Sequence, residues 1–188
     1  MNECPALRIT PRAWEKLSLY IRLAEGEVGG LASVEADGAD WRMIDCFLIA
    51  QRATDVDCEL DPAATSRFLL DYLASGADPG ALCLWWHSHA RETVFWSTDD
   101  ERTIDHFGGE WLISVVGNQR GKFLARLDRY EPRRETIGWL DFLAPGPPPP
   151  DQGPAAEQAC AELAQRVQLV PRHTNKLWTD GELPRRHG

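Results

Sequence analysis

The sequence predicts an α/β or α+β fold, a mixed β-sheet with helices packed on it. Three observations lead to this prediction. Some segments carry apolar residues at helical spacing behind helix-start signals, and others are short apolar and aromatic runs between turn signals. The two kinds of segment are interleaved along the chain. At 188 residues, the chain is long enough for one domain with a sizeable core and a C-terminal tail.

The first third of the chain predicts one helix and a pair of strands. Thr10 and Pro11 form an N-cap and first-turn pair, so we expect a helix over residues 10–24. Residues 31–35 and 41–50 are predicted strands joined by an Asp-Gly turn. The expected apolar face of the helix consists of Trp14, Leu17, Tyr20, Ile21 and Ala24.

The middle of the chain predicts a helix, a buried strand and a short helix. The second helix is expected over residues 61–76, where an Asp-Pro pair opens it and a glycine ends it. Residues 81–89 form an apolar and aromatic run typical of a buried strand, and residues 90–96 form a loop. Ser97 is expected to cap the third helix. The predicted apolar face of the second helix is Phe68, Leu69, Tyr72 and Leu73.

Three strand-like runs complete the predicted sheet, at residues 111–116, 122–130 and 135–142. The globular domain, residues 1–144, is followed by a Pro/Gly-rich linker over residues 145–154 that cannot fold alone. Residues 155–188 are expected to form a C-terminal amphipathic helix and a polar tail. This helix could dock on its own domain, on a second copy or on a partner. Its predicted apolar face is Ala156, Cys160, Leu163, Val167 and Val170.

Composition and charge argue against several classes of protein. The net charge of -9 argues against phosphate-backbone binding, so we expect no nucleic-acid partner. The longest apolar run, residues 81–86, is too short to cross a bilayer, and the N-terminus lacks the features of a secretory signal. Five scattered cysteines without a C-x-x-C pair argue against a disulfide framework. We therefore expect a cytoplasmic protein with no membrane partner.

The segment with the most chemical content is His87-Ser88-His89, followed by seven residues and then by Ser97 and Asp100. Two histidines at i and i+2 of a strand point to the same face, so both can bind one ion. Asp100, one turn into the next helix, can supply a third ligand if the loop folds back. Zinc favours imidazole nitrogen and carboxylate oxygen, and a catalytic zinc site leaves its fourth position to water.

Each half of this pattern has a commoner explanation. An isolated H-x-H is more often a pair of polar residues near a strand end, and Ser97-x-x-Asp100 alone is close to a capping box. The joint pattern H-x-H-x7-S-x-x-D is expected by chance in on the order of one sequence in a few thousand. The serine can also cap the helix and face the metal at once. The joint pattern therefore favours zinc bound by His87, His89 and Asp100.

This motif is similar to the signature of the JAMM metalloproteases, also described as MPN+, Mov34/Pad1-like or JAB-domain proteins. That family has a further glutamate upstream, at a strand edge, in a Glu-x-x-Gly context, and the stretch from Glu27 to Gly30 matches it. The resemblance covers about residues 5–143 and implies a JAMM/cytidine-deaminase-like sheet flanked by helices. Two positions depart from the family pattern. Ala90 stands where proline often follows the second histidine, and Val34 stands where a second small residue is usual.

The resemblance implies a role for each matched residue. His87, His89 and Asp100 would bind zinc, with water as the fourth ligand. Glu27 would take the proton of that water as general base and later deliver it to the leaving amine. Ser97 would donate a hydrogen bond to the oxyanion of the tetrahedral intermediate.

Other acidic residues near the motif are alternatives for these roles. Asp99 could replace Asp100 as a ligand, but only Asp100 has the spacing of the family. Glu27 is preferred as the base because two glycines follow it in the family context. The rival glutamates are Glu25, Glu35 and Glu92.

Aromatic side chains flank the motif. Phe95 and Trp96 lie in the loop before the third helix, where they could wall a substrate channel. One of Trp85 and Trp86 is expected in the core, because side chains alternate along a strand. Two further histidines are expected at the surface or in satisfied contacts, His106 and His173.

The JAMM family cleaves amide or isopeptide bonds at the C-terminal tail of ubiquitin or ubiquitin-like proteins. The resemblance therefore implies a zinc-dependent isopeptidase or peptidase that acts on a bacterial ubiquitin-like protein or its conjugate. Prokaryotic members occur beside E1-like and E2-like proteins, which makes these the candidate partners. An alternative is release of an amino acid or peptide from a sulfur-carrier protein. A non-catalytic scaffold subunit is a further alternative, against which the complete set of site residues speaks.

Overall fold

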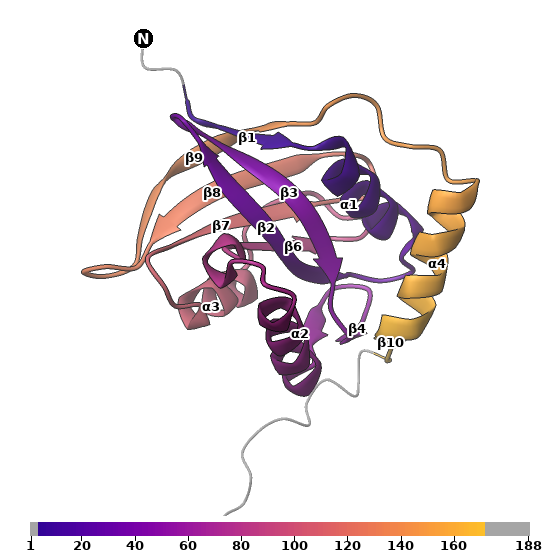
Figure 1. The fold of residues 1–188 in the computed structure, drawn as a ribbon. Helices are drawn as coiled ribbons and strands as arrows, with labels where there is room; N and C mark the ends of the chain where they lie inside the picture. Colours follow the sequence, from indigo (N-terminus) through magenta and orange to yellow (C-terminus); the bar gives the residue numbers. More distant parts are fainter. Residues whose placement is uncertain (1–3, 172–188) are drawn as a thin grey trace, which may run out of the picture.

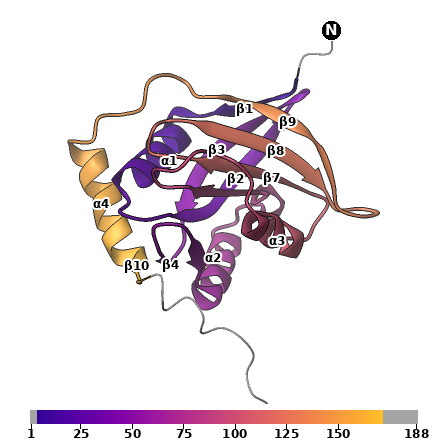
Figure 2. The same cartoon turned by 180° about the vertical axis from the view of Figure 1, so that it is seen from behind.

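The computed structural model describes residues 4–171 of the chain. Its centre is a mixed sheet of seven strands that closes into a barrel (Figures 1 and 2). The strands are β1 (Ala6–Ile9), β2 (Gly29–Asp37), β3 (Asp40–Leu48), β6 (Leu84–Ser88), β7 (Trp111–Gly117), β8 (Phe123–Arg129) and β9 (Glu135–Leu143). Their order in the sheet is β1-β3-β2-β6-β7-β8-β9, and β1 pairs with β9 to close it.

Helices and a second, smaller sheet surround this barrel. Within residues 4–171, the α-helices are α1 (Pro11–Leu23), α2 (Pro62–Ala74), α3 (Thr98–His106) and α4 (Pro154–Arg166). A 3-10 turn, η1 (Pro79–Ala81), precedes β6. The small sheet has the order β10-β4-β5 and consists of β10 (Val167–Leu169), β4 (Gln51–Ala53) and β5 (Cys58–Leu60). The predicted α+β class with a mixed sheet is thereby confirmed.

The predicted helix starts are confirmed by their capping hydrogen bonds. The Thr10 side chain accepts from the backbone N–H of Ala13, and the Asp61 side chain accepts from that of Ala64. Both helices have proline in the first turn, as expected. Within residues 4–171, no helix is long and apolar enough to span a membrane.

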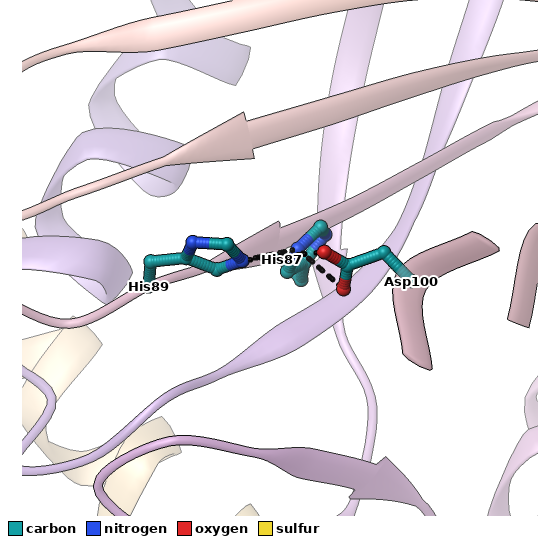
Figure 3. A group of neighbouring side chains, drawn as sticks. All are labelled: His87, His89 and Asp100. Atoms are coloured by element: carbon teal, nitrogen blue, oxygen red, sulfur yellow. Dashed lines mark hydrogen bonds and ion pairs between the residues drawn. The ribbon is translucent and has the colours of Figure 1, made fainter. Parts of the chain in front are cut away.

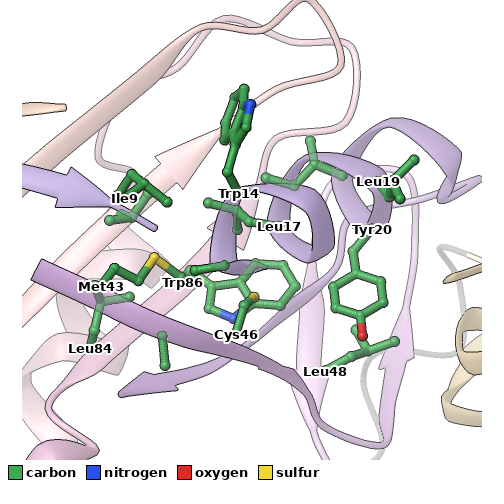
Figure 4. Packing of buried hydrophobic residues seen from close by; sticks show 14 of the residues in the cluster. Ile9, Trp14, Leu17, Leu19, Tyr20, Met43, Cys46, Leu48, Leu84 and Trp86 are labelled. Carbon is green, nitrogen blue, oxygen red and sulfur yellow. The ribbon is translucent and has the colours of Figure 1, made fainter. Parts of the chain in front are cut away.

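Two hydrophobic clusters hold helices on opposite faces of the sheet. Trp86 is fully buried in the main cluster, where its ring stacks against Tyr20 of α1 at a centroid distance of 6.1 Å (Figure 4). Trp85 points to the other face and packs with Ile104 of α3 in a second cluster. Side chains alternate along a strand, so neighbouring tryptophans of β6 serve different clusters. The expectation that one of them lies in the core is confirmed, and the second is buried as well.

The predicted apolar face of α2 is wrong in part. Phe68 and Tyr72 pack against Phe47 of β3, with ring centroids 5.0 and 5.7 Å away. Leu69 and Leu73 are 38% and 48% exposed. The helix contacts the sheet through one narrow i, i+4 pair, and the residues next to this pair in sequence point away from the sheet.

The predicted apolar face of the C-terminal helix is also wrong in part. The helix ends at Arg166, and Val167 begins β10, which pairs in parallel with β4. Cys160 is exposed. The free edge of β4 offers hydrogen-bond partners that helical periodicity in the sequence cannot reveal. The buried residues of the helix are Ala156, Ala159 and Leu163. They pack on α1 in the main cluster, so the helix docks on its own chain.

Four short strands were not predicted: β1, β4, β5 and β10. Each has three or four residues, too few for a periodic pattern to be recognised. Their positions depend on partners far away in the sequence, such as β3 and β9 for β1.

Gly30 occupies a position in β2 where no larger residue fits. A Cβ added there would lie 2.0 Å from the carbonyl oxygen of Phe47 and 2.9 Å from the ring of Trp86. We expect Gly30→Ala to lower the free energy of unfolding by about 3 kcal/mol, because the backbone of β3 must move. Urea unfolding measures this. Gly138→Ala is the matched control, since nothing lies within 4 Å of its added Cβ. A loss at Gly30 no larger than at Gly138 would contradict the argument.

Candidate metal centre

The two histidines of the motif lie at the carboxyl end of β6 and face the same side of the sheet as Trp85. His87 is 2% exposed and stacks on the Trp85 ring at a centroid distance of 4.3 Å. His89 follows at i+2, just past the end of the strand, and is 5% exposed. This is the face that α3 covers, so a side chain from the first turn of α3 can reach both histidines.

The start of α3 fixes the position of the third acidic group. The Ser97 side chain accepts from the backbone N–H of Asp100 (3.1 Å), and Asp100 Oδ2 accepts from the backbone N–H of Ser97 (2.7 Å). This reciprocal capping box holds the Asp100 carboxylate at the helix end. Asp100 is buried, whereas Asp99 is exposed and pairs with Arg102.

The three residues bring two imidazole nitrogens and the two carboxylate oxygens of Asp100 close together (Figure 3). His87 Nε2 lies 3.2 Å from His89 Nε2 and 2.9 Å from Asp100 Oδ1, and His89 Nε2 lies 3.3 Å from Asp100 Oδ2. Ligands of a tetrahedral zinc ion stand about 3.3 Å apart, given bond lengths of about 2.0 Å. Two imidazole nitrogens and one carboxylate form a donor set that suits such an ion. The buried His-His-Asp group can therefore hold a metal.

A hydrogen bond orients His89, and burial favours the neutral form of His87. His89 Nδ1 lies 3.1 Å from the Thr93 carbonyl oxygen, a contact in which Nδ1–H donates and Nε2 keeps its lone pair. Burial lowers the pKa of His87, which favours the neutral imidazole that binds metal. Burial also lowers the pKa of His89, but its contacts with Asp100 and Thr93 outweigh burial and raise this pKa. Burial raises the pKa of Asp100, but its contacts with His87, His89 and the backbone N–H of Ser97 outweigh burial and hold this pKa well below its usual range.

The antiparallel register of β2 and β6, continued by two residues, brings Glu27 opposite His89. Gly29 of β2 pairs with His87 of β6 in an antiparallel register, and this register continues toward Glu27. Val28 extends the pairing, since its N–H donates to Ser88 Oγ (3.0 Å) and its carbonyl oxygen accepts from the Ser88 N–H (2.8 Å).

The surroundings of Glu27 set it apart from the other glutamates near the motif. Glu27 is 7% exposed, and burial raises the pKa of its carboxyl to about 8, with Asp100 adding to the rise and His89 opposing it. The rival glutamates are all exposed, Glu25, Glu35 and Glu92.

A buried arginine braces the helix that carries Asp100. Arg126 of β8 is 4% exposed and donates to Glu101 (2.9 Å from Nη2) and to Asp128 (2.9 Å from Nε). Its guanidinium also lies over the ring of Trp96, 4.5 Å from the centroid. Sequence reasoning missed this network. Charged residues at i and i+2 of a predicted strand, Arg126 and Asp128, were the available signal.

The two aromatic residues of the loop differ in their surroundings. Phe95 is 49% exposed and lies edge-on to His89 at a centroid distance of 4.8 Å, where a bound molecule could contact it. Trp96 is half-buried in the second cluster, between His87 and Arg126. His106 is exposed, as expected, and His173 lies outside the described residues.

Ala90 explains one departure from the JAMM pattern. It has φ of 40°, the left-handed region, and it directly follows His89. Proline is fixed near φ of about −65° and cannot adopt this conformation. The loop after the second histidine therefore leaves β6 along a path that excludes the proline often found there.

The comparisons with known proteins found a similarity of fold only. No protein-family model and no curated protein matches the chain. Among solved structures, it is similar to the solution structure of protein DSY2949 from Desulfitobacterium hafniense, with 16% sequence identity and a TM-score of 0.54. The match covers 76% of this chain and 94% of that chain. The two proteins share a fold, and at this identity the similarity says nothing of activity.

Proposed function

We propose that this chain is a zinc-dependent peptidase or isopeptidase of the JAMM type that cleaves after the C-terminal tail of a ubiquitin-like protein. The buried triangle of His87, His89 and Asp100 carries the proposal, because its donor separations suit a tetrahedral ion. The buried glutamate in register beside it supplies the base that hydrolysis needs. The proposal includes a JAMM-like fold, with which the order of helix, hairpin, helix, histidine strand and aspartate helix agrees.

The roles of the chain's residues follow from their positions. Zinc held by the triad would polarise the scissile carbonyl and lower the pKa of a water ligand. Glu27 takes a proton from the attacking water and passes it to the nitrogen of the leaving amine. Ser97 Oγ accepts the N–H of Asp100, so its own hydrogen is free to donate to the oxyanion.

Features around the site support an extended protein tail as substrate. Cys58 at the start of β5 packs against Gly29, with Sγ 3.2 Å from the position of an added Cβ. Within the described residues, β5 is an edge strand, and an extended tail can bind such an edge through its backbone. Exposed leucines lie on α2, which follows β5, and apolar surface of this kind marks protein contacts. They are Leu69, Leu70 and Leu73.

A cleavage assay tests the proposal. The purified full chain is expected to contain zinc by elemental analysis and to release a C-terminal extension from a ubiquitin-like fusion. A chelator should abolish cleavage and added zinc should restore it, because the side chains of the triad are Lewis bases and the bound metal would supply the Lewis acid. The control is a fusion whose terminal glycines are replaced by valines, because a valine side chain prevents the close backbone approach that glycine allows.

Each outcome separates one function from another. Purified protein without zinc would sink the enzyme hypothesis and leave the scaffold subunit. Cleavage of sulfur-carrier fusions in preference to other ubiquitin-like fusions would favour the alternative substrate. Neighbouring genes for ubiquitin-like and E1-like proteins would favour deconjugation, and cysteine-biosynthesis neighbours would favour the sulfur carrier.

A further inference from the structure

The C-terminal segment, residues 154–170, lies against the loop that presents Glu27 (Figure 1). We propose that this segment is a positioning element that holds Glu27 in place beside the triad. The inference rests on the proposed function for the role of Glu27 as a base. The contacts that carry it are independent of that role.

Backbone hydrogen bonds connect the last strand to Glu27 through β4. The N–H of Val170 donates to the carbonyl oxygen of Ala53 (2.9 Å), and the N–H of Glu27 donates to the carbonyl oxygen of Thr54 (2.8 Å). Adjacent carbonyls of one short segment thus bind the C-terminal strand and the base. The parallel pairing of Leu169 with Ala53 extends this connection along β10.

Side-chain packing makes the same connection. A Cβ added at Gly26 would lie 2.3 Å from the Thr54 carbonyl oxygen and 3.2 Å from Leu169 Cδ2. Gly26, the residue before Glu27, therefore lies between the end of β4 and the Leu169 side chain of β10. Only glycine allows this close approach. Leu23 and Ala24, which lead into the loop, line one hollow together with Val167 and Leu169.

β4 also holds the other side of Glu27. The Gln51 side chain accepts from the N–H of Gly29 (2.8 Å) and donates to the Gly29 carbonyl oxygen (2.8 Å). The chain around Glu27 is thus attached at two points, through its own N–H to Thr54, directly after β4, and through Gly29 to Gln51 of β4. Because β4 has three residues, its order depends on its neighbours β5 and β10. Loss of β10 would leave β4 with β5 as its ladder partner.

α4 anchors β10 to the body of the protein. Its residues Ala159 and Leu163 are buried in the main cluster with α1. The hydroxyl of Tyr20 on α1 donates to Glu162, and Arg166 Nη1 donates to the carbonyl oxygen of Leu48 (2.6 Å). α1 leads directly into the Glu27 loop, so the helix pair and the strand pair hold this loop from two sides.

The test removes one backbone donor and follows the amide of Glu27. Val170→Pro eliminates the N–H that binds Ala53, and we expect the Glu27 amide to exchange with solvent at least about fivefold faster. The amide of His89, which donates to Gly117, is the internal reference and should keep its wild-type rate. Zinc content should stay unchanged, whereas kcat should fall because the base loses its fixed position. Val170→Ala keeps the N–H and should retain wild-type exchange.

A second variant keeps the proposal testable if the proline variant unfolds. Leu169→Ala leaves every backbone hydrogen bond in place and removes the contact with Gly26, so it should also speed exchange at Glu27. Unchanged exchange at Glu27 in Val170→Pro and in Leu169→Ala would overturn the inference. Exchange that is accelerated equally at His89 and at Glu27 in Leu169→Ala would overturn it as well. A wild-type protein without zinc would overturn the proposed function instead, and the exchange rates would still decide the positioning role.

Discussion

Glu27→Gln is expected to reduce kcat on a ubiquitin-like fusion by about 10²–10⁴-fold, with zinc content unchanged. Glutamine has nearly the same shape as glutamate, but its amide cannot accept and return a proton. The backbone around this position is held by bonds that the change leaves intact, from Glu27 to Thr54 and from Val28 to Ser88. The loss should therefore appear in turnover and not in stability. Steady-state kinetics and elemental analysis of the same preparation measure both quantities.

Glu25→Gln is the matched control for this prediction. Glu25 lies in the same loop and is exposed, so its change removes the same charge at a distance of two residues. Wild-type turnover is expected. Wild-type turnover in the Glu27 variant would mean that another group is the base. Loss of zinc in that variant would instead make Glu27 a ligand.

The candidate site is predictable because its parts are local in sequence. Two histidines on one face of a strand follow from side-chain alternation, and Ser97 at a helix start follows from capping chemistry. The loop of residues 90–96 between the histidines and Ser97 is short enough for the Asp100 side chain to reach both histidines. The main helices and longer strands are predictable for the same reason, since their signals lie within one segment.

The parts that the sequence does not reveal depend on distant partners. β10 forms where it does because β4 has a free edge more than a hundred positions earlier, and the valine at its start fits either a helix face or a strand. The Arg126 network likewise joins β8 to α3, and only the fold brings Arg126 to Glu101. Leu69 and Leu73 of α2 are the opposite case. Their apolar spacing predicts a buried helix face, but both side chains are exposed in the fold.

Asp100→Asn is expected to abolish the stabilisation that zinc gives the wild-type protein. A metal that binds only the folded state at about 1,000 times its Kd adds about 4 kcal/mol to the free energy of unfolding. For a chain of this length, that corresponds to a rise in Tm of roughly 10 °C. Asparagine keeps an oxygen that can accept the Ser97 N–H, so the helix cap survives, but it loses the negative charge that the ion needs. Thermal unfolding with chelator and with buffered zinc measures the difference.

Asp99→Asn is the control that separates a ligand from a charge near the helix end. Both aspartates lie in the first turn of α3 and interact alike with the helix dipole, but only Asp100 lies within 3.3 Å of both histidines. The Asp99 variant should keep the full zinc-dependent rise in Tm, while the Asp100 variant should show almost none. Loss of the rise in the Asp99 variant alone would transfer the ligand role to Asp99. A wild-type Tm that does not respond to zinc would mean that the triangle of donors holds no such ion, because binding to the folded state must raise stability.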